Sequence, residues 1–195
     1  MRFTTIGFIL FLAAVLFVPA QASADTYVLD QAHTSVGFSV KHLGLSTVSG
    51  TFDDFKGTID WDGKNMASGK IDVTIQAASV DTRIKMRDDD LRTAYFDTAK
   101  FPAITFKSKK VIATGADAAQ VVGDLTIKGV TKEVTLDVKF EGTVEKDPWG
   151  KTRSAFAATG KIKRQDFGVK SSNPLSDSAV GDEVTIVIQT EAIKQ

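Results

Sequence analysis

Polar and apolar residues alternate along most of the chain after residue 24, as expected for β-strands with one buried and one solvent-facing side. Between residues 69 and 77, Ile71, Val73 and Ile75 fall on one face and polar residues fall on the other. The same alternation occurs in segments 35–40, 104–108, 123–127, 133–141, 155–162 and 184–190. The pattern predicts an all-β domain.

The one-sided pattern favours an antiparallel sandwich or barrel, because strands of a doubly covered parallel sheet are apolar on both faces. The apolar face changes parity between Phe52 and Phe55. A β-bulge at Asp53-Asp54 would keep both rings in the core and would also help the sheet to curve. Turn sequences that contain glycine or proline separate the strands, so consecutive hairpins are the expected connections.

The alternation fails between residues 79 and 98, where charged residues interleave with apolar ones. A short helix over about residues 83–91, near one end of the sheet, is predicted there. The acidic run from Asp88 to Asp90 is interpreted as its solvent-facing side. About seven to nine strands with one or two short helices fit a sandwich or an up-and-down barrel, and a barrel of about eight strands can hold one small ligand. The alternation alone leaves open whether the centre is hollow.

Residues 1–24 have the three regions of a secretory signal peptide: a cationic start at Arg2, an apolar run over residues 6–18, and a small-x-small site ending at Ala24. The apolar run is shorter than the roughly 20 residues of a membrane-spanning helix. Cleavage after Ala24 would leave one domain over residues 25–195. Since Arg2 is the only charged residue removed, that domain has a formal charge of −1. We expect it to be exported to the periplasm.

Composition narrows the chemistry that this domain can perform. The chain has no cysteine and only two histidines, His33 and His42, so cysteine nucleophiles are excluded and imidazole bases are few. The near-neutral charge predicts no nucleic-acid partner. Motifs of serine hydrolases, phosphate-binding loops and zinc proteases do not occur. The sequence therefore predicts a protein that is not an enzyme and that uses no cofactor.

Four polar residues have competing interpretations. His33 and His42 lie nine residues apart, on opposite faces of a regular strand, which disfavours joint metal ligation. The favoured interpretation is a hydrogen-bonded histidine at a strand end or barrel mouth, where an imidazole could also recognise a polar lipid head. Arg92 and Arg164 could each bind a phosphate or pair with a nearby carboxylate, and the carboxylate pair is favoured for Arg92.

Short motifs spread over residues 26–193 carry a more specific signal through their order and spacing. They are Tyr27-Val28-Leu29-Asp30 with His33 and Ser35, Phe38-Ser39-Val40-Lys41-His42-Leu43-Gly44, Val48-Ser49-Gly50-Thr51-Phe52, Leu91-Arg92, Tyr95-Phe96-Asp97, Phe101-Pro102, Thr105-Phe106-Lys107-Ser108, Gly123 to Lys132 and Ile162 to Val169. With these motifs the sequence resembles the YceI family of periplasmic, lipocalin-like polyisoprenoid-binding proteins.

The resemblance implies an extended eight-stranded antiparallel lipocalin-like β-barrel with a short helix near one end and a long apolar channel. It also implies binding, storage or transport of a long-chain amphiphile, such as a polyprenyl phosphate, an isoprenoid quinone or a fatty-acid derivative, without catalysis. In a hollow barrel, phenylalanines that would otherwise fill the core become ligand walls. The predicted ligand-binding residues are His33, Phe38, His42, Phe52, Arg92, Phe96, Phe106, Phe140, Phe156 and Arg164.

Two alternatives stay open at this point. One is a hydrolase or isomerase that acts on a lipid with His33 or His42 as its base. The other is a stress-related structural protein whose core is filled. The predicted partners are an amphiphilic lipid, a membrane contacted transiently and, through exposed strand surfaces such as that at Val187, a second copy of the chain.

Overall fold

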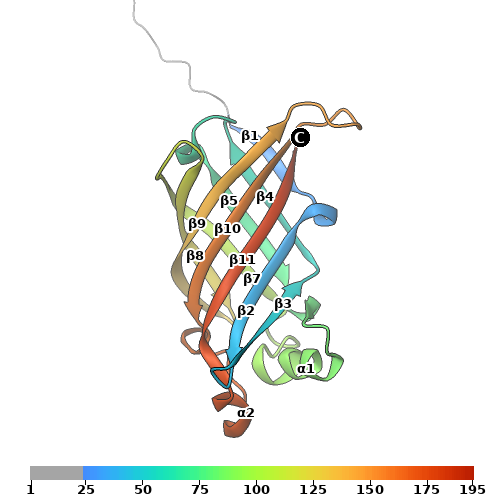
Figure 1. The fold of residues 1–195 in the computed structure, drawn as a ribbon, viewed down its shortest axis with the longest axis vertical. Coiled ribbons are helices and arrows are strands. Elements are labelled where there is room, and N and C mark those ends of the chain that lie inside the picture. Colours follow the sequence, from blue (N-terminus) through green and yellow to red (C-terminus); the bar gives the residue numbers. More distant parts are fainter. Residues whose placement is uncertain (1–23) are drawn as a thin grey trace, which may run out of the picture.

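The computed structural model describes residues 24–195, so the predicted signal peptide falls outside the described residues except for Ala24 and stays a prediction. The strands are β1 (Asp25–Leu29), β2 (Ser35–His42), β3 (Ser46–Phe52), β4 (Phe55–Trp61), β5 (Lys70–Gln76), β6 (Val80–Asp81), β7 (Ala103–Ala113), β8 (Ala118–Ile127), β9 (Val130–Val144), β10 (Arg153–Lys163) and β11 (Val180–Lys194). Eight of them follow the order β1-β4-β5-β7-β8-β9-β10-β11, and β11 pairs back to β1 (Figure 1). The predicted antiparallel barrel is confirmed.

Strands β2 and β3 extend the barrel wall beyond β1 and β4. Strand β11 pairs with β1 over residues 192–194 and with β2 over residues 180–189, so β1 and β2 act as one strand interrupted by η1 (Gln31–His33). Likewise β3 pairs with β2 and β4 pairs with β1, with a break of two residues between them. Phe52 and Phe55, on the two sides of this break, are both buried, as predicted. The change of parity occurs at a break between two strands with different partners rather than at a β-bulge within one strand pair.

The chain between β5 and β7 leaves the barrel wall and covers one end of it. It contains η3 (Ala77–Ser79), β6, α1 (Lys85–Asp90) and the π-helical turn η4 (Leu91–Tyr95). The predicted helix is therefore present, although it begins at Lys85 and runs on into a π-turn. Helix α2 (Pro174–Ser178) lies at the same end (Figure 1), which we call the helical end. Two further short turns are η2 (Met66–Ser68) and η5 (Arg164–Phe167).

Side-chain hydrogen bonds fix the start of α2 and the position of α1. In α2, the side chain of Asn173 accepts a hydrogen bond from the backbone N–H of Leu175, and Pro174 takes the first helical position, which needs no donor. The prediction that the acidic run faces solvent holds for Asp89 and Asp90 but is wrong for Asp88. Asp88 is buried because it accepts hydrogen bonds from the backbone N–H and the hydroxyl of Thr82, which tie α1 to the end of β6. Within residues 24–195, no helix has the length and apolar character needed to cross a bilayer.

Candidate functional site

The barrel encloses a cavity of about 900 Å³. This volume lies near the upper end of the range of about 300–1,000 Å³ that small-molecule sites occupy. The inward faces of the strands form its wall, and most of the wall is aliphatic or aromatic. The alternative of a completely filled core is therefore wrong.

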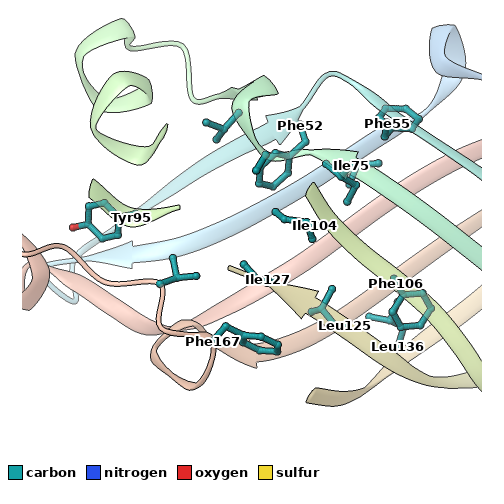
Figure 2. Close-up of a cluster of buried hydrophobic side chains, with 14 of the residues drawn as sticks. Phe52, Phe55, Ile75, Tyr95, Ile104, Phe106, Leu125, Ile127, Leu136 and Phe167 are labelled. Carbon is teal, nitrogen blue, oxygen red and sulfur yellow. The ribbon is translucent and has the colours of Figure 1, made fainter. Parts of the chain in front are cut away.

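The cavity wall follows directly from the period-2 pattern of the strands. Ile75 of β5, Ile104 of β7, Leu125 and Ile127 of β8 and Leu136 of β9 belong to one buried cluster and all line the cavity (Figure 2). Leu125 and Ile127 are two residues apart and thus share a face of β8. The side chains on the inward face of these strands are buried, and the cavity lies next to them.

An aromatic cluster closes the barrel opposite the helical end. It consists of Tyr27, Trp61, Phe140 and Phe156, and the ring of Trp61 lies 6.1, 5.1 and 5.5 Å from the ring centroids of the other three. The indole N–H of Trp61 donates a hydrogen bond of 3.0 Å to the carbonyl of Asn65, which fixes the orientation of the ring. Trp61 and Phe156 form the end wall of the cavity.

Polar side chains gather at the other end of the cavity, the mouth, between α1, α2 and the β2–β3 turn. His42 and Lys41 come from the end of β2, Arg87 and Asp90 from α1, and Ser176 from α2. The hydroxyls of Thr34 and Thr190, which also line the cavity, bond to each other at 2.8 Å. The cavity is thus largely apolar along its length, and charged side chains stand where it opens. Such an arrangement suits a molecule with a long apolar tail and a polar head.

Arg87 is the cationic group at the mouth with the clearest geometry. Its Nε donates a hydrogen bond of 2.7 Å to the hydroxyl of Thr82, and its Nη2 donates one of 2.8 Å to the Thr82 carbonyl. Thr82 is itself held by Asp88, so a chain of hydrogen bonds orients the guanidinium. Among residues 24–195, Nη1 of Arg87 has no acceptor.

Arg164 also lines the cavity, but its donors are used within the fold. It is 4 % exposed and pairs with the Asp177 carboxylate at 2.7 Å. The guanidinium also donates to the main-chain carbonyls of Val169, Asp177, Val180 and Gly181. These acceptors occupy all five N–H groups of an arginine. Of the two interpretations of Arg164, the structure therefore shows the carboxylate pair, which anchors α2.

Three of the predicted ligand-binding residues do not line the cavity. Arg92 donates to the carbonyls of Ala78 and Val80 and pairs with Asp89 at 3.2 Å, as the favoured interpretation required. Phe140 packs behind the end wall, in the aromatic cluster. His33 lies in η1 rather than in a strand.

His33 takes part in an ion-pair network between β1 and β10. Its Nδ1 lies 2.8 Å from Asp30 Oδ2, and Asp30 also accepts a hydrogen bond from Arg153. The hydrogen bond from Arg153, helped by His33, lowers the pKa of Asp30 to about 2. Ligand atoms of Asp30, His33 and Glu191 lie within 4.8 Å of one another, and Arg153 supplies the positive charge at this cluster by pairing with both carboxylates.

The other seven predicted residues line the cavity: Phe38, His42, Phe52, Phe96, Phe106, Phe156 and Arg164. Sequence reasoning missed Arg87, which directly precedes the acidic run from Asp88 to Asp90, and it did not include Trp61 of the end wall among the ligand-binding residues. A signal for Trp61 existed, because it shares the inward parity of Phe55 and Ile59 in β4. No comparable signal marked Arg87, since its contact with Thr82 depends on how the α1 segment folds back.

Comparisons with known proteins agree on one family. The model of the YceI-like domain matches residues 27–192. Protein YceI of Escherichia coli is 44% identical over 187 residues, which cover 94% of each chain. The crystal structure of Burkholderia cenocepacia BcnA superposes with a TM-score of 0.75 at 29% identity, covering 84% of this chain and 98% of that one. A domain from Saccharophagus degradans, described as polyisoprenoid binding, superposes with a TM-score of 0.66 at 20% identity, over 87% of this chain and 98% of its own, and so shares the fold.

Proposed function

The chain belongs to the YceI-like family, and we propose that it binds a long-chain amphiphile in the barrel cavity and stores or transports it without chemical change. The observation that carries the proposal is an apolar cavity of about 900 Å³ that is walled by aromatic rings at one end and polar at the other. A polyprenyl phosphate or an isoprenoid quinone has this shape and polarity. The description of the Saccharophagus degradans domain supports the same class of ligand.

The driving force for such binding is removal of the tail from water. Burial of one CH₂ group contributes about 0.8 kcal/mol, so a long prenyl chain supplies a large gross free energy. Association and ordering of the chain offset much of this sum, and measured affinities reach a ceiling. A dry cavity can therefore hold its ligand tightly with few polar contacts, and the polar mouth is left to distinguish between heads.

The distribution of polar groups indicates the orientation of the ligand. We propose that the tail points toward Trp61 and that the head lies at the mouth, beside Arg87. A role without catalysis is supported by the position of the histidines, since His33 lies outside the cavity wall and only His42 reaches its mouth. Of the two histidines, His42 is thus the one that could act as a base on a lipid held in this cavity.

A single pair of substitutions on β10 tests whether the cavity is the binding site. Ala158 lines the cavity, whereas its neighbour Ala157 does not. We expect Ala158→Phe to prevent loading with a polyprenyl phosphate or a quinone, because the new ring occupies the space of the tail. Ala157→Phe, the matched control, should load like the original protein. Native mass spectrometry after incubation with each lipid measures the bound fraction, and equal loading of the two variants would exclude the cavity as the site.

Export to the periplasm is a separate proposal, supported by the signal-peptide pattern of residues 1–24. The mature protein should appear in an osmotic-shock fraction with a mass that begins at Asp25. A chain that keeps Met1 and stays with the cytoplasmic fraction would contradict it.

A further inference from the structure

The helical end of the barrel carries an exposed apolar rim around the cavity mouth. The rim consists of Leu43 and Leu45 in the β2–β3 turn, Ile84 and Met86 at the start of α1, and Leu175 in α2. We propose that this rim docks the barrel, mouth first, on the surface of an anionic lipid bilayer, so that the ligand passes between membrane and cavity without crossing water. This inference rests on the proposed binding of an amphiphile.

The exposure of the rim is unusual for side chains of this size. Leu45, Met86 and Leu175 are 81 %, 81 % and 82 % exposed, and Leu43 and Ile84 are at least half exposed. Single exposed apolar residues are common, but a group of them at one site marks a surface for a protein or a membrane. The three elements that carry them lie together at the helical end (Figure 1).

The rim is continuous with the interior of the barrel. Leu175 is almost fully exposed and also lines the cavity, so apolar surface runs from the wall of the cavity to the outside of the molecule. A prenyl tail that leaves a bilayer through this opening stays in contact with apolar side chains. A soluble protein partner would not require a continuous apolar path from the cavity to the outside. The path therefore favours a membrane as the partner of the rim.

The backbone of the β2–β3 turn supports a role for Leu43 outside the fold. The N–H of Leu45 donates to the carbonyl of His42, and the two central residues, Leu43 and Gly44, have φ of 51° and 69°. Turns with two positive φ values favour Asn, Asp or Gly, and a bulky residue is strained there. Leu43 gains no burial in exchange, since its side chain is exposed. A strained apolar residue at this position is consistent with selection for a surface contact.

Charge around the rim favours an anionic surface. Lys41 precedes the turn, and Arg83 and Lys85 flank Ile84, so cationic and apolar side chains alternate as they do in segments that lie in a membrane interface. Within the described part of the chain, neither Lys41 nor Arg83 forms an ion pair, and the acidic Asp89 is already paired with Lys85 and Arg92. Asp90, which is exposed at the mouth, also forms no ion pair there, so Lys41 and Arg83 outnumber it.

Flotation of the full chain with lipid vesicles tests this inference. We expect association with vesicles of phosphatidylethanolamine and phosphatidylglycerol, and a reduction of roughly tenfold or more in the triple variant Leu43→Ser, Leu45→Ser, Met86→Ser, whose three residues do not line the cavity. Lys41→Gln with Arg83→Gln should weaken association about fivefold per residue on these vesicles and little on phosphatidylcholine vesicles. The matched control is Trp149→Ser, which removes a side chain that is 73 % exposed in the loop between β9 and β10 and should leave association unchanged.

A second measurement separates this inference from the proposed function. The triple variant should still load a polyprenyl phosphate presented in detergent micelles, since none of its three substituted residues lines the cavity. Wild-type protein that loads from micelles but does not associate with vesicles would overturn the docking and leave the cavity function standing. Vesicle association that is unchanged in the triple variant would also overturn the docking. The same holds for a concentration-dependent dimer that the triple substitution abolishes, if vesicles bind no protein.

Discussion

At the scale of single residues, Arg87 and Arg164 show that two arginines lining one cavity can have different roles. Both line the mouth region, but Arg164 uses all its donors within the fold and Arg87 leaves Nη1 without an acceptor among the described residues. Arg164→Gln should lower the free energy of unfolding by about 3 kcal/mol, because Asp177 loses its partner in a largely buried setting. Arg87→Gln should lower it less, by about 1 kcal/mol, because that variant loses the two hydrogen bonds to Thr82.

The same pair of variants separates head recognition from folding. We expect Arg87→Gln to weaken binding of a polyprenyl phosphate by roughly tenfold to a hundredfold, the value of a hydrogen bond to a charged group, and to leave binding of a quinone almost unchanged. Competition binding with both lipids measures this difference, with Lys85→Gln as an exposed control. If the two lipids lose affinity equally, Arg87 does not contact the head.

The low pKa of Asp30 predicts how stability responds to acid. Its folded-state pKa, about 2, is lower than the ordinary value of 3.8, so its contribution is present above pH 3.8 and is lost as the pH falls toward 2. Thermal unfolding followed from pH 7 to pH 2 should show this loss. In Asp30→Asn the decline should be shallower, and an equally steep decline would place the acid-sensitive group elsewhere.

At the scale of secondary-structure elements, the strands were predictable because each buries one face. The alternation at Ile71, Val73 and Ile75 located β5 almost to its ends, because side chains of a strand point alternately to its two faces. The η1 interruption between β1 and β2 was not predictable, because it depends on β11 pairing with both strands in turn. The π-turn at the end of α1 likewise depends on tertiary contacts of Tyr95 and its neighbours.

The β2–β3 turn provides a prediction at this scale. Replacing Leu43 by Asn should raise the free energy of unfolding by about 0.5–1 kcal/mol, because Asn tolerates positive φ better than a bulky apolar residue does. Lys128 is the informative comparison: it has φ of 53° before Gly129, but its Nζ donates to the Tyr95 carbonyl at 2.9 Å. Lys128→Asn should therefore gain little or lose stability. Denaturant midpoints of the two variants measure these changes in stability. A destabilised Leu43→Asn variant would show that Leu43 stabilises the folded protein.

At the scale of the whole molecule, the alternation could not reveal that the barrel is hollow. It placed Phe38, Phe52 and Phe106 correctly on the inside, and whether such rings meet depends on the circumference and tilt of the closed sheet. The resemblance to a lipid-binding family, rather than the periodicity, supplied the expectation of a channel. The position of the mouth could not be predicted either, because it arises where α1 and α2, far apart in the sequence, lie at the same end of the barrel (Figure 1).

The closed end of the cavity should set the length of tail that the protein accepts. Phe156 forms part of the end wall and packs against Phe140 behind it. Phe156→Ala therefore opens space toward Phe140 and should shift binding toward longer polyprenyl phosphates. The substitution should also cost about 3–5 kcal/mol of stability, as buried aromatic truncations do. Phe167→Ala provides the matched control, because Phe167 is also a buried phenylalanine but does not line the cavity. Mass spectrometry of protein loaded from a mixture of chain lengths measures the preference, and identical distributions in the two variants would mean that the aromatic cluster does not limit the tail.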